Sequence, residues 1–380
     1  MRSLRFLVEI LGMTNQCNLR CTYCDWKKDD MYILTEEDKK KIKKNILKIK
    51  TFLEEYHNDV QLIEYSGGET LMYPEIVEIL CDTFKDKWLR IISNGVLVDD
   101  RIIKIIKNHK KVFMAISLDG NRIEANRARF GNSQMLFNKV LDNIDMLIEN
   151  KIPVMILCTL SKFSIDYFPE YVKSIEKKYE REIAEGMLVM PAHYVTNYSK
   201  DNGVPSPEQV QNLKKFIYGE GKQYMLINRI QKHYDSLVKY AEKKPKCHAC
   251  TINEWNLSMH FRGKNIIDGK FLSFGCGMRG VMENGLFDIN NEEDMNKYLD
   301  IIHSEDYITK FKRFTNNGIK ENEQSGFNEL NEQCDKKCFV DWTIIDYIIN
   351  RKVNYEDAEE WFIMFKDQNI KNWVMQYAEQ

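Results

Sequence analysis

The chain has 380 residues, of which 43% are hydrophobic and 29% are charged. This composition is typical of a globular protein with two or three domains of ~150 residues, and it excludes intrinsic disorder. The net charge of -2 gives no overall basic surface for nucleic acid. No apolar run reaches the ~18 residues of a membrane span, and no signal peptide precedes the first strand, so we expect a cytoplasmic protein.

Short apolar runs alternate with amphipathic helical segments up to about residue 192. The runs that predict strands are Leu4–Leu11, Val60–Tyr65, Leu89–Ser93, Val112–Ser117, Val154–Leu160 and Met187–Met190. Six β-α repeats predict an α/β fold with a parallel sheet, open or curled into a partial TIM-like barrel. In such folds functional groups lie at the C-terminal ends of the strands.

The first predicted helix covers Glu36–His57. Thr35 followed by three acidic residues is a capping-box pattern. The Lys-rich stretch Lys39–Lys50 indicates either a nucleic-acid patch or a solvated outer face, and we favour the solvated face. The apolar face of this helix is predicted to contain Ile42, Ile46, Leu47, Ile49 and Leu53.

The remainder of the chain lacks this alternation. Residues 200–207 have the composition of a linker, two helical stretches follow to about Lys244, and residues 246–339 are rich in Gly and Asn. We therefore expect a barrel domain over residues 1–199, a linker with helices over 200–245, a small cysteine-rich domain over 246–342 and a C-terminal helical tail over 343–380.

Ten cysteines are too few for a disulfide scaffold. Cys81 and Cys158 stand alone in apolar surroundings and are predicted to be inert core residues. The other eight occur in three tight groups, which suggests metal binding: Cys17, Cys21 and Cys24; Cys247, Cys250 and Cys276; Cys334 and Cys338.

The first group, Cys17-x3-Cys21-x2-Cys24, follows the first predicted strand. Structural zinc takes four ligands in a closed tetrahedron, whereas this loop offers three thiolates. An iron-sulfur cubane bound by three cysteines leaves one iron with an open position. The spacing favours a cluster, and zinc remains the alternative.

The segment TNQCNLRCTYCDW, including Tyr23, resembles the signature of the radical S-adenosylmethionine (SAM) superfamily. The resemblance covers roughly residues 4–192. Further similar motifs follow in order: Tyr65–Glu69 (the GGE motif), Ser93–Gly95 (SNG), Ser117–Gly120 (SLDG) and Asn126–Arg129, where many relatives read HDxxRG. Two departures lie beside the last motif, namely Ala125 in place of His and Phe130 in place of Gly.

The resemblance implies a partial (β/α)6 TIM-like barrel in which Cys17, Cys21 and Cys24 hold a [4Fe-4S] cluster. The fourth iron would be chelated by the amino and carboxylate groups of SAM. It also implies a reductant such as flavodoxin or ferredoxin. Gly67 and Gly68 are expected near the methionine amine, with Glu69 positioning that region. Ser117 and Asp119 are expected at the ribose hydroxyls, and Arg129 at the methionine carboxylate. Tyr23, Ser93 and Asn94 are also expected at the cofactor.

The second cysteine set offers five thiols between residues 247 and 338. Two short pairs far apart also fit a zinc ribbon. Residues 267–276 are similar to the hairpin of SPASM and twitch extensions, which hold auxiliary [4Fe-4S] clusters. A full SPASM extension needs at least seven cysteines, so we expect one auxiliary cluster held by Cys247, Cys250, Cys276 and either Cys338 or Cys334.

The resemblance leaves several functions open. The favoured one is modification of a ribosomal precursor peptide by crosslinking, epimerisation or excision. Because the chain opens directly on a strand, we expect that a separate leader-recognition protein is then required or that the leader binds elsewhere. Alternatives are dehydrogenation of a small molecule such as an aminocyclitol or sugar, activation of a partner enzyme or sulfatase, and a non-enzymatic zinc module. No membrane and no nucleic acid partner is expected.

Overall fold

A computed structural model of the chain describes residues 7–11, 16–24, 33–56, 60, 62–194, 203, 205–229, 231, 234, 272–273, 286–288 and 290–302. These residues belong to two compact units. The first unit contains the described residues among 7–16, 33–91 and 272–302. The second contains those among 17–24 and 92–234.

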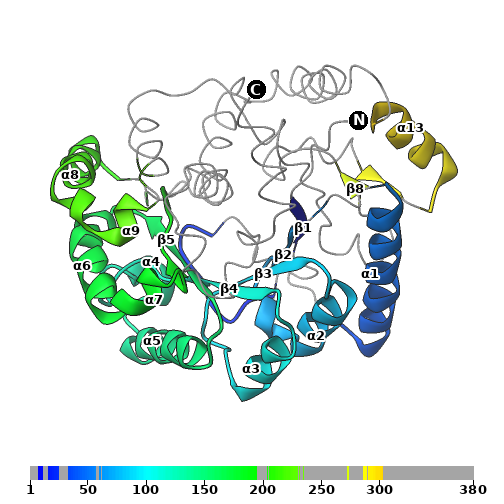
Figure 1. Ribbon diagram of the computed structural model, residues 1–380, viewed down its shortest axis with the longest axis horizontal. Helices are drawn as coiled ribbons and strands as arrows, with labels where there is room; N and C mark the ends of the chain where they lie inside the picture. Colours follow the sequence, from blue (N-terminus) through cyan, green and yellow to red (C-terminus); the bar gives the residue numbers. More distant parts are fainter. Residues whose placement is uncertain are drawn as a thin grey trace. The chain divides into compact units, whose positions relative to one another are not determined.

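The first unit is built on three parallel strands in the order β1-β2-β3. Helices α1 and α2 pack against each other, as Figure 1 shows, and a short antiparallel hairpin of β8 and β9 precedes α13. The elements are β1 (Leu7–Leu11), α1 (Glu36–Tyr56), β2 (Leu62–Ser66), η1 (Thr70–Met72), α2 (Pro74–Thr83), β3 (Trp88–Ser93), β8 (Leu272–Ser273), β9 (Leu286–Phe287) and α13 (Glu292–Ile302).

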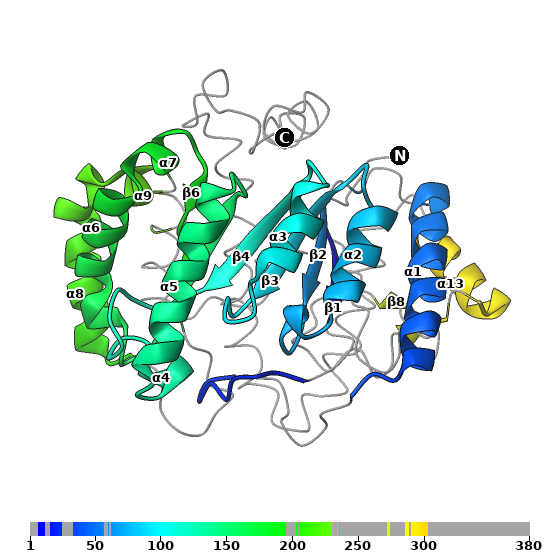
Figure 2. The same ribbon diagram turned by 90° about the horizontal axis from the view of Figure 1, so that it is seen from below.

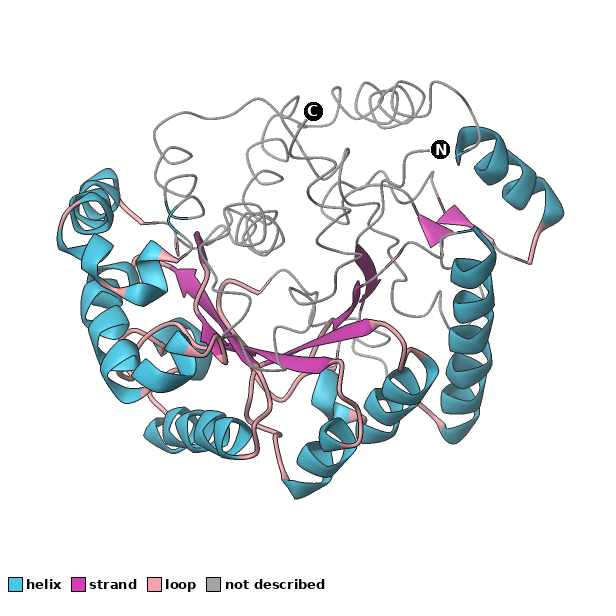
Figure 3. Cartoon of the chain, in the orientation of Figure 1, coloured by secondary structure: helices cyan, strands magenta, loops and turns pink. Residues whose placement is uncertain are grey.

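The second unit starts from the last residues of β3 and continues with parallel β4, β5 and β6, while β7 pairs with the far end of β5. Helix α5 packs on β5, and α6 packs on α8 and α9 (Figure 2). Helices α5, α6 and α7 lie on one side of β4 and β5 (Figure 3). The elements are α3 (Asp100–Lys107), β4 (Val112–Ser117), α4 (Arg127–Phe130), α5 (Gln134–Glu149), β5 (Val154–Leu160), η2 (Ile165–Tyr167), α6 (Phe168–Lys178), α7 (Glu180–Ala184), β6 (Leu188–Val189), β7 (Ala192–Tyr194), α8 (Pro207–Tyr218), η3 (Glu220–Gln223) and α9 (Met225–Asn228).

The strand predictions are confirmed within a few residues. The predicted ranges 112–117 and 154–160 coincide with β4 and β5, because continuous burial on both faces of a parallel strand leaves a continuous apolar run. The predicted run 187–190 contains the short strand β6, and a further short strand that was not predicted, β7, follows Pro191. The hairpin β8–β9 and helix α13 lie in the region for which the sequence predicts little periodic structure.

Helix α1 begins as predicted. The Thr35 Oγ1 accepts a hydrogen bond from the Asp38 backbone N–H at 3.2 Å, and the Asp38 carboxylate accepts one from the Thr35 backbone N–H at 2.9 Å. Leu47 was wrongly placed in the buried face, since it is 48% exposed. It follows the buried Ile46 by one residue and is therefore turned by about 100° away from the apolar stripe.

The lysines of α1 have acidic neighbours on the same helix. Lys41 pairs with Glu37 at 3.0 Å and Lys50 with Glu54 at 3.5 Å. These exposed i,i+4 pairs fit the solvated face that we favoured over a nucleic-acid patch. None of the helices in the described ranges combines the length and apolar character that a bilayer crossing requires.

Candidate active site

The cysteine loop, residues 17–24, contains three cysteine thiols at the beginning of the second unit. Cys17 and Cys21 are half-buried and Cys24 is exposed. The Leu19 backbone N–H donates to the Cys17 Sγ at 3.3 Å, and the Cys24 N–H donates to the Cys21 carbonyl at 3.2 Å. An N–H bond to sulfur is one of the interactions by which proteins tune iron-sulfur sites.

The donor set of this loop fits a cluster better than a single ion. Among the described residues, no three His, Cys, Asp or Glu side chains converge on one ion position. In a cubane each thiolate binds a different iron, so its cysteines need not converge on one point. Burial raises the pKa of the Cys21 thiol to about 11, against the opposing effect of the Arg129 charge.

Asn94 connects the end of β3 to the beginning of the cysteine loop. Its Nδ2 donates to the Asn18 Oδ1 at 2.7 Å and lies 3.7 Å from the Cys17 Sγ. Its Oδ1 accepts from the Val96 backbone N–H at 3.0 Å, which fixes the orientation of the amide. Asn94 was predicted at the cofactor, and in the second unit it contacts the first cysteine directly.

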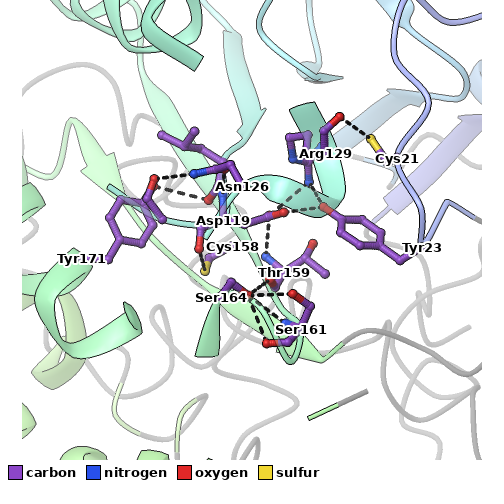
Figure 4. A network of polar contacts seen from close by, with 12 residues as sticks. Cys21, Tyr23, Asp119, Asn126, Arg129, Cys158, Thr159, Ser161, Ser164 and Tyr171 are labelled. Carbon is purple, nitrogen blue, oxygen red and sulfur yellow. Dashed lines mark hydrogen bonds and ion pairs between the residues drawn. The ribbon is translucent and has the colours of Figure 1, made fainter. Parts of the chain in front are cut away.

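Tyr23, Asp119 and Arg129 meet in one buried cluster (Figure 4). The Tyr23 hydroxyl donates to the Asp119 Oδ2 at 2.5 Å and accepts from the Arg129 Nη2 at 2.5 Å. The same Nη2 lies 3.1 Å from the Asp119 Oδ1. Asp119 and Arg129 are 1% and 8% exposed, so this ion pair is removed from water.

The protonation states of this cluster are set by burial and by the ion pair. Burial raises the pKa of Tyr23 well above its usual value, so its hydroxyl stays a neutral donor. Burial acts against the charged form of Arg129, but the Asp119 carboxylate beside it raises the pKa of the guanidinium above its ordinary value. The arginine is therefore a permanent cation at this end of β4.

The loop between β4 and α4 is organised by Asn126. Its Oδ1 accepts from the Asp119 backbone N–H at 2.8 Å, and its Nδ2 donates to the Gly120 and Arg122 carbonyls at 2.8 and 2.9 Å. Helix α4 then ends at Phe130, where Gly131 adopts φ 60°. Only glycine takes this conformation easily, so the shift of the glycine by one position relative to HDxxRG leaves a short helix containing Arg129.

Glu69 lies with Gly67 and Gly68 in the loop after β2, in the first unit. Its backbone N–H donates to the Gln16 carbonyl at 2.8 Å, and its carboxylate accepts from the Leu71 N–H at 3.0 Å. Glu69 is 4% exposed. It therefore holds its own loop and the residue that precedes Cys17.

Ser93 and Ser117 end β3 and β4. The Ser93 Oγ accepts from the Gly95 backbone N–H at 2.9 Å. Gly95 has φ 79°, and a Cβ atom there would lie 2.8 Å from the Ile116 Cγ2, so the SNG motif needs glycine for both conformation and space. Ser117 is half-buried.

Sequence reasoning missed Asn18 and Thr159 as parts of this site, and it placed Asn126 in a motif without giving its side chain a role. The Thr159 backbone N–H donates to the Asp119 Oδ1 at 3.0 Å. Because the donor is a backbone N–H, this contact leaves no recognisable residue pattern in the sequence. Asn126 carried a signal, since an Asn seven residues after the Asp of SLDG can close the loop by side-chain hydrogen bonds.

Cys81 and Cys158 are 1% and 0% exposed, which confirms their prediction as core residues. Burial raises the pKa of both thiols, so neither is a reactive thiolate. The second cysteine set, Cys247, Cys250, Cys276, Cys334 and Cys338, lies outside the described residues.

The parallel α/β fold is shared with solved radical SAM enzymes. Native anSMEcpe with bound AdoMet superposes with a TM-score of 0.54 at 17% identity, over 92% of this chain and 98% of that chain. SuiB of Streptococcus suis bound to S-adenosylmethionine gives a TM-score of 0.54 at 13% identity, over 80% of this chain and 67% of that chain. The predicted α/β partial-barrel class is thereby confirmed.

Sequence relatives are distant and catalyse different reactions. The GTP 3',8-cyclase of Clostridium perfringens is 25% identical over 76% of this chain and 87% of its own length. The neomycin C epimerase of Streptomyces fradiae is 29% identical over 33% of this chain and 38% of its own length. An uncharacterised protein of Methanocaldococcus jannaschii is 24% identical over 65% of this chain and 79% of its own length.

Residues 11–175 match the family model of the radical SAM superfamily. This range contains the cysteine loop, Asn94 and the Tyr23–Asp119–Arg129 cluster. Enzymes of this superfamily use a [4Fe-4S] cluster and SAM, and the three thiols of the loop fit that cluster. The chain therefore carries a radical SAM domain over these residues and is a radical SAM enzyme.

Proposed function

We propose that this enzyme holds its [4Fe-4S] cluster on Cys17, Cys21 and Cys24 and modifies a ribosomally made precursor peptide. The observation that carries the proposal is the cysteine loop itself. Of its three thiols, Cys17 lies against Asn94 at the end of β3 and Cys21 lies against the Arg129 carbonyl after β4. When bound, the cluster supplies the electron that cleaves SAM to a 5'-deoxyadenosyl radical, which abstracts a substrate hydrogen.

The protein side chains bind and orient SAM in this proposal. Ser117 and Asp119 contact the ribose hydroxyls, while Ser93 and Asn94 shape the wall beside the first cysteine. Arg129 pairs with the methionine carboxylate. Support for Arg129 comes from its Nε, which is buried and has no hydrogen-bond acceptor among the described residues.

The loop of Gly67, Gly68 and Glu69 acts at the methionine amine. Glycines there let the SAM amine approach the backbone without a Cβ in the way. The Glu69 carboxylate keeps the loop in place through the Leu71 N–H, and its backbone N–H bond to Gln16 fixes the residue before Cys17.

The peptide substrate is favoured by the likeness to anSMEcpe. That protein was solved with bound AdoMet and the peptide Kp18Cys, at a TM-score of 0.51 and over 92% of this chain. A peptide substrate would be presented to this chain by a separate leader-recognition protein. The electron donor would be a flavodoxin or ferredoxin, and the compartment the cytoplasm.

An auxiliary [4Fe-4S] cluster belongs to the same proposal. Cys247, Cys250, Cys276 and either Cys338 or Cys334 would hold it in a twitch-like region. Four thiolates close the coordination of every iron, so this second cluster would transfer electrons and would not bind SAM.

A second candidate function is the oxidation or rearrangement of a small molecule such as an aminocyclitol or sugar. It is favoured by two relatives whose names give small-molecule substrates. These are the GTP 3',8-cyclase at 25% identity and the neomycin C epimerase at 29% identity. The two candidates share the SAM site and differ only in substrate.

The test of the SAM chemistry is anaerobic reconstitution followed by iron analysis. Two cubanes give about eight iron and eight sulfide per chain, and the double variant Cys276→Ala, Cys338→Ala should hold about four. With dithionite and SAM the enzyme should form 5'-deoxyadenosine, and Cys21→Ala should abolish it. Cys81→Ala, which removes a buried core thiol, is the matched control and should keep both properties.

The substrate class is tested by mass spectrometry. The enzyme is co-expressed with short precursor peptides encoded beside its gene, or incubated with aminocyclitols, and each product is examined for a changed mass. A modified peptide supports the first candidate. Turnover of an aminocyclitol together with unchanged peptides contradicts it and supports the second.

A further inference from the structure

The cysteine loop is fixed to the rest of the second unit at two places. At its beginning, Asn94 contacts Asn18 and Cys17. At its end, the Thr22 backbone N–H donates to the Ala128 carbonyl at 2.8 Å and the Cys21 Sγ lies 3.9 Å from the Arg129 carbonyl. At the second of these places, Tyr23 also makes side-chain contacts with Asp119 and Arg129.

The Tyr23 hydroxyl contacts two side chains, one of which is fixed in turn by a third residue. Asp119 follows β4, Arg129 belongs to α4, and the Asp119 carboxylate is fixed in turn by the Thr159 N–H on β5. Figure 4 shows Asp119 and Arg129 meeting at the hydroxyl oxygen, while Thr159 contacts the Asp119 carboxylate. Because Tyr23 lies between Cys21 and Cys24, fixing its position restricts how both thiols can move.

The buried ion pair gives this contact its strength. Hydrogen bonds to charged groups are about twice as strong as those between neutral groups, and the low dielectric around Asp119 strengthens them further. A buried pair of this kind stabilises the protein only where its remaining donors and acceptors are satisfied. The Tyr23 hydroxyl satisfies one acceptor of Asp119 and one donor of Arg129, while the Arg129 Nε has no acceptor among the described residues.

We propose that Tyr23, Asp119 and Arg129 form a latch that positions the cysteine loop for cluster binding, with the Tyr23 hydroxyl as its positioning group. The latch restrains the cysteine loop whether or not a cluster is bound. Its effect on the bound cluster rests on the proposed function, whereas its effect on the bare thiols does not. Asp119 and Arg129 thus have a second task besides the contacts proposed with SAM.

Tyr23→Phe isolates the hydroxyl. The Arg129 guanidinium lies 5.5 Å from the centre of the Tyr23 ring, and a phenylalanine ring keeps that cation–π contact and the packing. The matched control is Tyr179→Phe in the same unit. Its hydroxyl donates to the Asp145 Oδ1 at 2.6 Å on α5, and Tyr179 is a residue outside the site.

The first experiment measures alkylation of Cys21 by iodoacetamide in the full chain without cluster, followed by peptide mapping. If the latch restrains the loop, Tyr23→Phe should raise the alkylation rate about tenfold, the effect of losing about 1.4 kcal/mol of local stability. Tyr179→Phe, which also removes a hydroxyl–carboxylate hydrogen bond, should leave the rate at the wild-type value. Equal alkylation rates in the two variants would overturn the latch.

The second experiment measures the release of iron from the reconstituted enzyme to a chelator. Tyr23→Phe should release iron about tenfold faster than the wild type and Tyr179→Phe at the wild-type rate. Equal rates contradict the latch. If the wild type binds no iron, the proposed function fails, and the alkylation rates still decide whether the latch exists.

Discussion

Each of the two units contains a buried arginine–carboxylate pair, and the two pairs differ in their place along the strands. Glu64 on β2 and Arg90 on β3 face each other in parallel register inside the sheet, with side chains 6% and 2% exposed. Asp119 and Arg129 lie beyond the C-terminal end of β4, also almost fully buried. The first pair links two strands, and the second links a strand end to the cysteine loop through Tyr23.

This difference shows how the same chemistry serves two purposes. A side chain in the middle of a strand has neighbours fixed by the sheet, so its ion pair acts on the stability of the sheet. A side chain just past a strand end faces the loops, which in parallel α/β folds carry the functional groups. The position relative to the strand end therefore separates a structural pair from one that acts on the site.

The largest loss of stability is expected from Arg90→Met. It leaves the buried Glu64 carboxylate without its arginine, and breaking a buried pair in this way costs about 3–5 kcal/mol of the free energy of unfolding, measured in urea. The double variant Glu64→Leu, Arg90→Met removes both charges and should recover most of that loss. A loss below about 1 kcal/mol in the single variant would mean that the pair behaves as a surface pair.

Asp119→Asn should have an intermediate effect on stability and a large one on the site. The amide cannot accept from all three of its present donors, so we expect a loss of about 2 kcal/mol in the free energy of unfolding. Cys21 alkylation should become faster and 5'-deoxyadenosine formation should fall. If Asp119→Asn changed only the free energy of unfolding, the Asp119–Arg129 pair would act on stability alone, as the Glu64–Arg90 pair does, and the proposed difference between the two pairs would be wrong.

Thr35→Ala should have the smallest effect. Thr35 caps α1 in the first unit, and losing such a cap costs about 1 kcal/mol. The urea midpoint should decrease slightly, and the rate of Cys21 alkylation should stay at the wild-type value. An alkylation rate as high as that of Asp119→Asn would show that any loss of stability loosens the cysteine loop. That result would contradict a specific role of the Asp119–Arg129 pair.

Much of the fold could be predicted because periodicity is local. Continuous burial makes β4 and β5 readable as apolar runs. Ser93 and Ser117 could be placed at the C-terminal ends of β3 and β4 for the same reason. The apolar stripe of α1 was predictable except for Leu47, whose position at the margin of the stripe depends on what packs there. The capping pattern at Thr35 is likewise contained in four consecutive residues.

The contacts of the site were not predictable in the same way. The sequence suggested Asp119 and Arg129 separately, as ligands of two different parts of SAM, because the motifs that contain them are separate. Their ion pair depends on the loop that Asn126 closes, and on the single turn of helix that ends at Gly131. No periodic pattern describes such a loop.

The sequence by itself determined the chemistry, because three thiols at short spacing and a set of ordered motifs limit which cofactor the chain can hold. The tertiary structure alone decided which of those residues touch. Hydrogen bonds and ion pairs depend on distances of a few ångström between segments about a hundred residues apart, as between Tyr23 and Arg129. Such distances follow from the packing of strands and helices and are not written in any local pattern of residues.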